Sequence, residues 1–224
     1  MAAPQRTVAD VELLPMTEAD LYEFAAGNLE AFPTFYAPLE HLNQYPSEDV
    51  RIQRQAKRLV NVINSEHTMA VKAVLAAGPD QGKLVGVTLW FRPSATKVLN
   101  LKRYDWEGRE TDEEAWSGVD VEKWNAKWAG WDSIRERIMD GYPHWYLAPL
   151  WVKPEYQGQG VGKKLLQQVL DLADSTTPTT PIFLEASAAG RPMYEKIGFT
   201  IEGDEASEYP ELVRWHADGR KRDR

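Results

Sequence analysis

The sequence has no cysteine, no long apolar run and no excess of basic residues, and each absence excludes a class of protein. Without cysteine the chain can form no disulfide, no cysteine-type metal site and no thiol nucleophile, and we expect no metal. No apolar stretch approaches the roughly 20 residues that span a bilayer, and residues 1–6 lack the apolar core of a secretory signal. We therefore expect a cytoplasmic protein without a membrane partner, although the nucleus is not excluded.

The charge balance is acidic, with 26 Lys and Arg residues against 34 Asp and Glu residues and a net charge of −8 at pH 7. This balance argues against a nucleic-acid partner and favours cationic partners such as amines, although solubility alone also explains an acidic surface. With 224 residues, 43% of them apolar, the chain can bury one substantial core.

The most informative stretch, residues 144–174, joins an apolar segment to a glycine-rich turn and then to a helical pattern. Aromatic and branched residues from Trp145 to Val152 predict a strand. Apolar residues recur at helical spacing from Val161, so the turn's free backbone N–H groups lie at a helix N-terminus. Free donors and the helix dipole both favour an anion there, and Lys163 adds positive charge. The turn therefore predicts a pyrophosphate site.

Two common phosphate-binding motifs are missing from this turn. The dinucleotide fingerprint G-x-G-x-x-G fails because residue 163 is Lys. The nucleotide P-loop fails because its glycine spacing is too short and Lys164 stands where Ser or Thr is needed. The pattern that is present is Q-x-x-G-x-G, from Gln157 to Gly162.

This pattern, placed after a strand, resembles the acyl-CoA signature of the GNAT superfamily of N-acetyltransferases. A second block supports the resemblance: residues 182–186 predict a strand, and Tyr194 to Phe199 reads Tyr-x-x-x-Gly-Phe, which is similar to the family's later strand–helix block. The resemblance implies an α/β (α+β) fold. We expect a mixed, mostly antiparallel sheet flanked by helices and splayed at the acyl-CoA site.

Other strands and helices precede these blocks. Capping residues predict helices that start after Thr17 and after Ser47, and the basic residues of the second helix are interpreted as a solvated face. Alternating patterns predict strands at Val8–Leu14, Thr68–Ala76 and Leu84–Phe91, the last two as a hairpin.

Residues 94–142 stand where the family usually has a short turn, so we expect a single domain over 1–224 with a Trp-rich helical insertion at 94–142. Five of the nine tryptophans lie there, and their spacing predicts a helix from Asp120, its N-cap, to Met139. Residues 97–115 are polar and predict a mobile loop. The aromatic stripe favours packing on the domain; a lid over the acceptor pocket or a dimer contact are the alternatives.

An acetyltransferase must hold an amine against a thioester, stabilise the oxyanion and move protons. Pro149 removes a ladder N–H in mid-strand and predicts interrupted pairing, often a bulge. The resemblance implies that the Leu150 N–H points at the thioester carbonyl and that Val152 pairs with the pantetheine amides. The residues expected at acetyl-CoA are Leu150, Trp151, Val152, Gln157, Gly158, Gln159, Gly160, Val161, Gly162, Lys163, Ser187 and Tyr194; many family members have Asn at the position of Ser187.

Tyr194 matches the family's usual general acid, a phenol near the CoA sulfur. Relatives carry the base at the position of Tyr146, so we consider His144, two residues earlier on the same strand face, as the base. Glu185, His216 and a chain of waters are lesser options. The residues expected at the acceptor are Phe32, Phe35, Tyr36 and Tyr146.

These observations predict an N-acetyltransferase that moves an acetyl group from acetyl-CoA to a primary amine of a small molecule, by direct attack in a ternary complex. Two alternatives are open: acetylation of a protein lysine or N-terminus, and a non-catalytic acyl-CoA-binding regulator. A homodimer is compatible with the resemblance.

Overall fold

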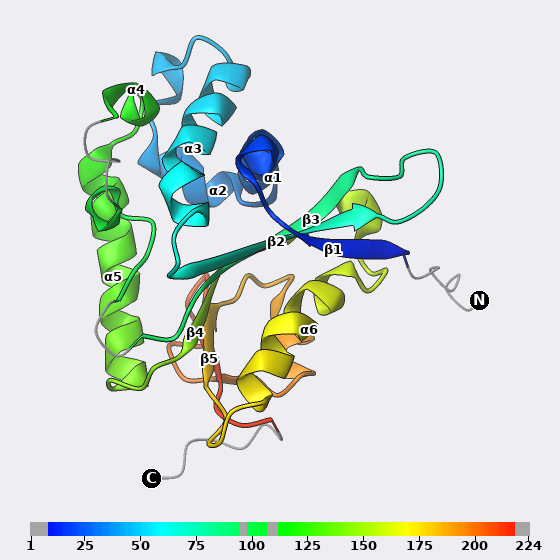
Figure 1. Cartoon of the computed structure of the whole chain (residues 1–224). Coiled ribbons are helices and arrows are strands. Elements are labelled where there is room, and N and C mark those ends of the chain that lie inside the picture. Colours follow the sequence, from blue (N-terminus) through cyan, green and yellow to red (C-terminus); the bar gives the residue numbers. More distant parts are fainter. Residues whose placement is uncertain (1–8, 95–97, 107–111, 218–224) are drawn as a thin grey trace.

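The computed structural model describes residues 9–94, 98–106 and 112–217 (Figure 1). Within them, seven strands form one sheet in the order β1-β2-β3-β4-β5-β7-β6. All neighbouring strands are antiparallel except β4 and β5, which are parallel. The predicted mixed, mostly antiparallel sheet is therefore confirmed. The strands are β1 (Val11–Pro15), β2 (Thr68–Leu75), β3 (Leu84–Phe91), β4 (Trp145–Val152), β5 (Ile182–Glu185), β6 (Thr200–Ile201) and β7 (Glu211–Arg214).

Helices cover both faces of the sheet. Figure 1 shows α1, α2 and α3 above the sheet and α6 below it, with α5 standing along one side. No helix in the described ranges is long and apolar enough to cross a membrane. The helices are α1 (Leu21–Ala31), α2 (Pro33–Tyr36), α3 (Glu48–Ile63), α4 (Glu113–Trp116), α5 (Val121–Met139), α6 (Val161–Asp174) and α7 (Arg191–Glu195).

The helix starts follow the capping residues seen in the sequence. The Thr17 N–H donates to the Asp20 carboxylate at 2.8 Å just before α1. The Ser47 hydroxyl accepts from the Val50 N–H at the start of α3, and the Asp120 carboxylate accepts from the Lys123 N–H at the start of α5. Each side chain satisfies a donor that the helix itself leaves unpaired.

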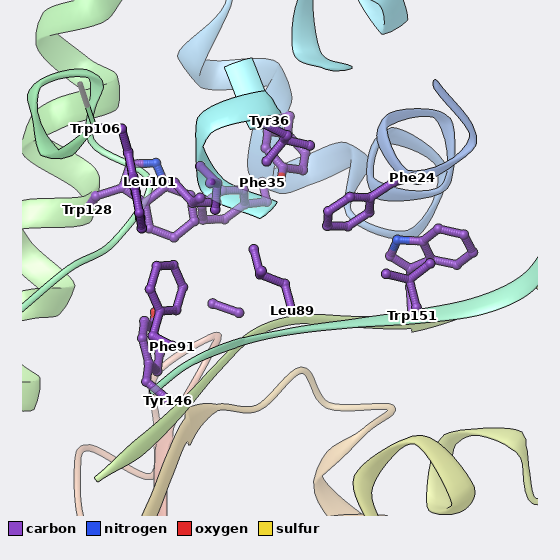
Figure 2. Packing of buried hydrophobic residues seen from close by; sticks show 14 of the residues in the cluster. Phe24, Phe35, Tyr36, Leu89, Phe91, Leu101, Trp106, Trp128, Tyr146 and Trp151 are labelled. Carbon is purple, nitrogen blue, oxygen red and sulfur yellow. The ribbon is translucent and has the colours of Figure 1, made fainter. Parts of the chain in front are cut away.

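The core has one layer on each face of the sheet. On the face toward α1 and α5, aromatic rings such as Phe24, Phe91 and Tyr146 pack together (Figure 2). On the opposite face, α6 packs residues such as Leu166 against Leu184 of β5. Alternate residues of β5 therefore face different layers, with Phe183 and Glu185 on the side of α1 and α5.

The β3–β4 connection (residues 92–144) is more ordered than its composition indicates. Asn100, Leu101, Lys102 and Trp106 are buried, and α4 lies within the stretch predicted as a mobile loop. Asn100 donates to the buried Asp132 of α5 at 2.9 Å, and Lys102 also donates to it. The loop prediction is thus wrong for 98–106 and 112–115, because polar side chains are held by a buried carboxylate; residues 97 and 107–111 lie outside the described ranges.

The basic face of α3 is also not simply solvated. Arg58 is 2% exposed and donates to the Ala115 carbonyl at 2.6 Å. Its guanidinium lies between the rings of Trp116 and Trp124, 5.5 and 5.3 Å from their centres, and contacts Glu40 at 3.3 Å. The interpretation as a solvated face is therefore wrong at Arg58, where a paired arginine joins α3 to the β3–β4 connection.

The sheet opens between β4 and β5. Their pairing covers only Trp145–Leu147 with Ile182–Leu184, although β4 continues to Val152. The register of β3 against β4 shifts beside Pro149, so the predicted interruption is confirmed. β1 starts at Val11 rather than Val8, and Val8 lies outside the described ranges.

Candidate active site

A groove lies beside the N-terminus of α6. Gly158 and Gly160 have φ of 72° and 84°, the left-handed region in which a β-carbon is unfavourable. Gly160 directly precedes α6, so the first amide groups of the helix have no acceptor within it. We call this the glycine groove; it is lined by Ala31, Phe32, Leu150, Trp151, Val152, Tyr156, Gln157, Gly158, Gly160, Gly162, Lys163, Ser187, Ala189, Gly190, Met193 and Tyr194.

Ten of the twelve residues predicted at acetyl-CoA line this groove, and two do not. Val161 is 2% exposed and packs in the core beneath the helix. The Gln159 side chain donates to the Glu155 carbonyl at 2.7 Å. Gln157 lines the groove, but its amide also donates to the Val152 carbonyl at 2.9 Å. That bond fixes the turn and occupies one of the backbone groups predicted to pair with pantetheine.

A second hollow lies on the α1 and α5 side of the opening between β4 and β5. Phe32, Phe35 and Tyr36, three of the four residues expected at the acceptor, line it together with rings from α5 that the sequence left between a lid and a packing role. Figure 2 shows Phe35, Tyr36 and Trp128. We call it the aromatic cavity; it is lined by Phe32, Phe35, Tyr36, Leu101, Trp128, Trp131, Leu147, Ala148, Pro149, Leu150, Glu185, Ser187, Tyr194 and Tyr209.

The two hollows meet. Four residues line both of them: Phe32, Leu150, Ser187 and Tyr194. Leu150 lies on β4 just beyond its last pairing with β5, so the meeting point is the place where the sheet opens. A ligand in the glycine groove can therefore contact a ligand in the aromatic cavity at the junction between them.

Two titratable groups lie in these walls: Tyr194 lines both hollows and Glu185 lines the aromatic cavity. Burial raises the pKa of the Tyr194 phenol, which therefore stays protonated at neutral pH. Burial also raises the pKa of Glu185 to about 8, although the Arg135 guanidinium acts in the opposite direction. The Glu185 carboxylate contacts the Tyr146 hydroxyl, and its Oε1 is buried with no partner in the described part of the chain.

The remaining candidates for the base lie elsewhere. His144 and Tyr146 line a neighbouring cavity with His67 and Arg92, and neither lines the aromatic cavity. The His144 ring nitrogen is 2.7 Å from the Tyr142 carbonyl, and burial lowers the pKa of this imidazole to about 4. His216 follows β7 and lines neither hollow. Of these candidates, Glu185 lines the aromatic cavity together with Tyr194, whereas His144 and His216 do not.

Sequence reasoning did not assign Leu101, Tyr209 or Met193 to the site. Tyr209 and Leu101 come from segments without a motif, so only the fold brings them to the cavity. Met193 lies next to Tyr194 in the second block, and its sulfur would be 3.4 Å from a β-carbon on Gly162.

Comparisons with known proteins agree with this geometry. The acetyltransferase (GNAT) domain model matches residues 110–209. Among solved structures, the chain is similar to histone acetyltransferase HPA2 and related acetyltransferase from Corynebacterium glutamicum, with 21% identity, a TM-score of 0.54 and coverage of 93% of this chain and 97% of the other.

Two further structures share the fold. PaiA N-acetyltransferase from Thermoplasma acidophilum in complex with coenzyme A is 15% identical, with a TM-score of 0.53 and coverage of 92% and 99%. Arabidopsis thaliana NAA60 in complex with a bisubstrate analogue is 15% identical, with a TM-score of 0.51 and coverage of 91% and 95%. Together, the domain match over residues 110–209 and these solved structures show that the chain has the fold of GNAT acetyltransferases.

Proposed function

We propose that the protein transfers an acetyl group from acetyl-CoA to a primary amine of a small molecule, within a complex that holds both substrates. One observation carries the proposal: the glycine groove and the aromatic cavity meet at Leu150 and Tyr194, with Glu185 on the cavity side. Direct transfer requires that the two bound substrates meet and that nearby groups can move protons. The proposed groups are Tyr194 and Glu185.

The groove fits a CoA ester. The first amide groups of α6 and the exposed Lys163 favour an anion at the helix N-terminus. Glycine at 158, 160 and 162 leaves the backbone accessible, and the groove continues to the junction at Tyr194. When bound, acetyl-CoA supplies the acetyl group as a thioester, whose carbon accepts the amine while the carbon–sulfur bond breaks.

The chain's own residues manage the protons. Glu185 in its carboxylate form accepts a proton from the acceptor nitrogen, and an incoming ammonium favours that form because its charge is opposite. Tyr194 donates its phenolic proton to the departing thiolate. The Leu150 amide, located where β4 leaves β5, is proposed to donate to the thioester oxygen.

The test combines binding with turnover. We expect acetyl-CoA to raise the melting temperature of the purified protein, and thiol release to require an added amine. Tyr194→Phe should lower kcat by about 100-fold while keeping the affinity for acetyl-CoA within about threefold, because only the hydroxyl is removed. A Tyr194→Phe protein as active as the wild type would exclude this residue as the acid. Binding of acetyl-CoA without thiol release for any amine would contradict the proposal.

A further inference from the structure

We propose that the amine acceptor carries a flat apolar group, such as an aromatic ring, and that the aromatic cavity holds this group. The inference rests on the proposed function, since it names the acceptor of that same site. It is carried by three features of the cavity: the kind of wall, the way in which the wall is closed, and the position of its charge.

The wall is made of rings. Phe32, Phe35 and Tyr36 come from the α1–α2 region, and Trp128 and Trp131 come from α5. Rings offer flat, apolar surfaces that prefer stacked or edge-to-face contact with other rings. A cavity with this wall is suited to a flat apolar group and gives few hydrogen bonds to a polar chain.

The rings close the cavity on one side. Phe35, Trp131 and Tyr209 contact one another in a triangle, with ring centres 5.2, 6.1 and 5.9 Å apart. The triangle joins α2, α5 and the segment between β6 and β7, which are far apart in the sequence. An extended peptide would have to separate these rings to cross the cavity, whereas a small amine would lie beneath them. The geometry therefore favours a small molecule over a polypeptide.

The lining of the cavity holds one acidic side chain. Within the described ranges, Glu185 is its one carboxylate, and Tyr194 lines the same cavity. One ammonium can pair with Glu185, but a second ammonium further along a polyamine would lie among the rings. Attraction to ring faces is weaker than the loss of water around a buried ammonium. The cavity therefore fits an amine with one charge at the reacting end and an apolar group at the other.

Part of this wall comes from the β3–β4 connection, which contributes Leu101, Trp128 and Trp131. Trp128 is fully packed, whereas Trp131 is only partly buried. Trp131 is thus the ring whose replacement changes the cavity with the least damage to the core. Ile138, two turns further along α5, packs against the same core but does not line the cavity, and it provides the matched control.

The experiment compares four acceptors by kcat/KM at saturating acetyl-CoA: 2-phenylethylamine, ethylamine, spermidine and a short peptide with a free N-terminus. We expect 2-phenylethylamine to exceed each of the others by at least about tenfold, because burial of its ring adds favourable contacts. Trp131→Leu should reduce kcat/KM for 2-phenylethylamine at least about fivefold more than for ethylamine. Ile138→Ala should keep the ratio of the two amines at the wild-type value.

A second measurement separates the two proposals. Calorimetric titration of 2-phenylethylamine into the protein with CoA should detect binding that Trp131→Leu weakens. If this binding occurs without acetyl transfer to any amine, the aromatic cavity holds a flat apolar group but the proposed function fails. If spermidine or the peptide is the preferred acceptor, or Trp131→Leu affects both monoamines equally, the inference is overturned while acetyl transfer stands.

Discussion

The glycine groove and the aromatic cavity meet at one point, yet they are built in different ways. The groove is assembled from two short stretches, residues 150–163 and 187–194, with the end of α1 as a further wall. The cavity draws its lining from Phe32 and α2, the β3–β4 connection, β4, β5, the segment after β5 and the segment before β7. The groove is thus a local structure, whereas the cavity exists only once distant segments have packed together.

The two hollows also use different chemistry. The groove presents backbone amides in conformations that glycine permits, which suits a phosphate that every CoA ester carries. The cavity presents side chains, and side chains distinguish one acceptor from another. Changes in the groove should therefore affect binding of the common substrate, and changes in the cavity should affect chemistry and choice of acceptor.

The largest effect is expected from a substitution that alters the glycine groove alone. Gly162→Glu places a carboxylate where the groove would hold a phosphate, and like charges repel. We expect the affinity for acetyl-CoA, measured by calorimetry, to fall by more than about 100-fold, which corresponds to about 2.7 kcal/mol.

Gly162→Ala is the matched control. Its β-carbon would lie 3.4 Å from the Met193 sulfur, which is ordinary contact. Acetyl-CoA affinity close to that of the wild type is expected. If Gly162→Glu also bound acetyl-CoA normally, the glycine groove would not be the CoA site.

The next effect is expected from removing the proposed base in the aromatic cavity, which leaves the glycine groove unchanged. Glu185→Gln keeps the shape but removes the base, so kcat should fall by about 100- to 1,000-fold with little change in acetyl-CoA affinity. Because the pKa of Glu185 is raised to about 8, the reactive carboxylate form increases with pH. In the wild type kcat/KM should therefore rise as the pH passes about 8, and this inflection should vanish in the variant.

Stability distinguishes this role from a structural one. Burial raises the pKa of Glu185 from 4.5 to about 8, so the folded protein loses stability as the pH rises between these values, and glutamine removes that loss. Above a pH of about 8 the variant should melt at the same temperature as the wild type or higher. A large loss of stability together with lost activity would mean that Glu185 mainly supports the fold.

The contrast between the hollows also explains what could be read from the sequence. Q-x-x-G-x-G and Tyr-x-x-x-Gly-Phe are short patterns whose residues stay close together in the fold, so the fold class and the place of the groove followed from them. The base did not, because His144 and Glu185 come from different segments of the chain, and only the fold shows which one lines the aromatic cavity with Tyr194.

The β3–β4 connection was harder to predict for another reason. A polar composition usually indicates a mobile segment, but here Asn100, Lys102 and Arg135 all bind one buried carboxylate, Asp132. Such a set is stable only as a whole, since each charge is acceptable in the core only with its partners. No periodicity in the sequence indicates that these side chains pair with Asp132. Nor does any pattern indicate that Arg58 donates to the Ala115 carbonyl of α4.

Arg135 influences the aromatic cavity although it lies outside the cavity's lining. Arg135 does not line the aromatic cavity, but its guanidinium lies 3.8 Å from the centre of the Tyr146 ring and lowers the pKa of Glu185 against the effect of burial. Arg135→Met should therefore move the inflection of kcat/KM above pH 8 and reduce activity at pH 7. Arg135→Lys keeps the positive charge and should shift the inflection of kcat/KM less. An unchanged inflection in Arg135→Met would show that Arg135 has no electrostatic influence on the base.

The smallest effects compare two helical glycines, one on the groove side and one on the cavity side. A β-carbon on Gly27 of α1 would lie 2.3 Å from the Trp151 indole, whereas one on Gly130 of α5 would meet nothing within 4 Å. Gly27→Ala should lower the free energy of unfolding by about 1–3 kcal/mol, because the helix must move away from a packed ring.

Gly130→Ala should instead raise that free energy by about 0.5–1 kcal/mol, since alanine is the better helix former and nothing obstructs it. Urea unfolding, followed by circular dichroism, measures both. The Gly27 change should in addition weaken acetyl-CoA binding, because α1 carries Ala31 and Phe32 to the groove wall. If Gly130→Ala left the unfolding midpoint unchanged, α5 would not be part of the cooperative unit that unfolds, and the aromatic cavity would depend on a helix less firmly held than the groove.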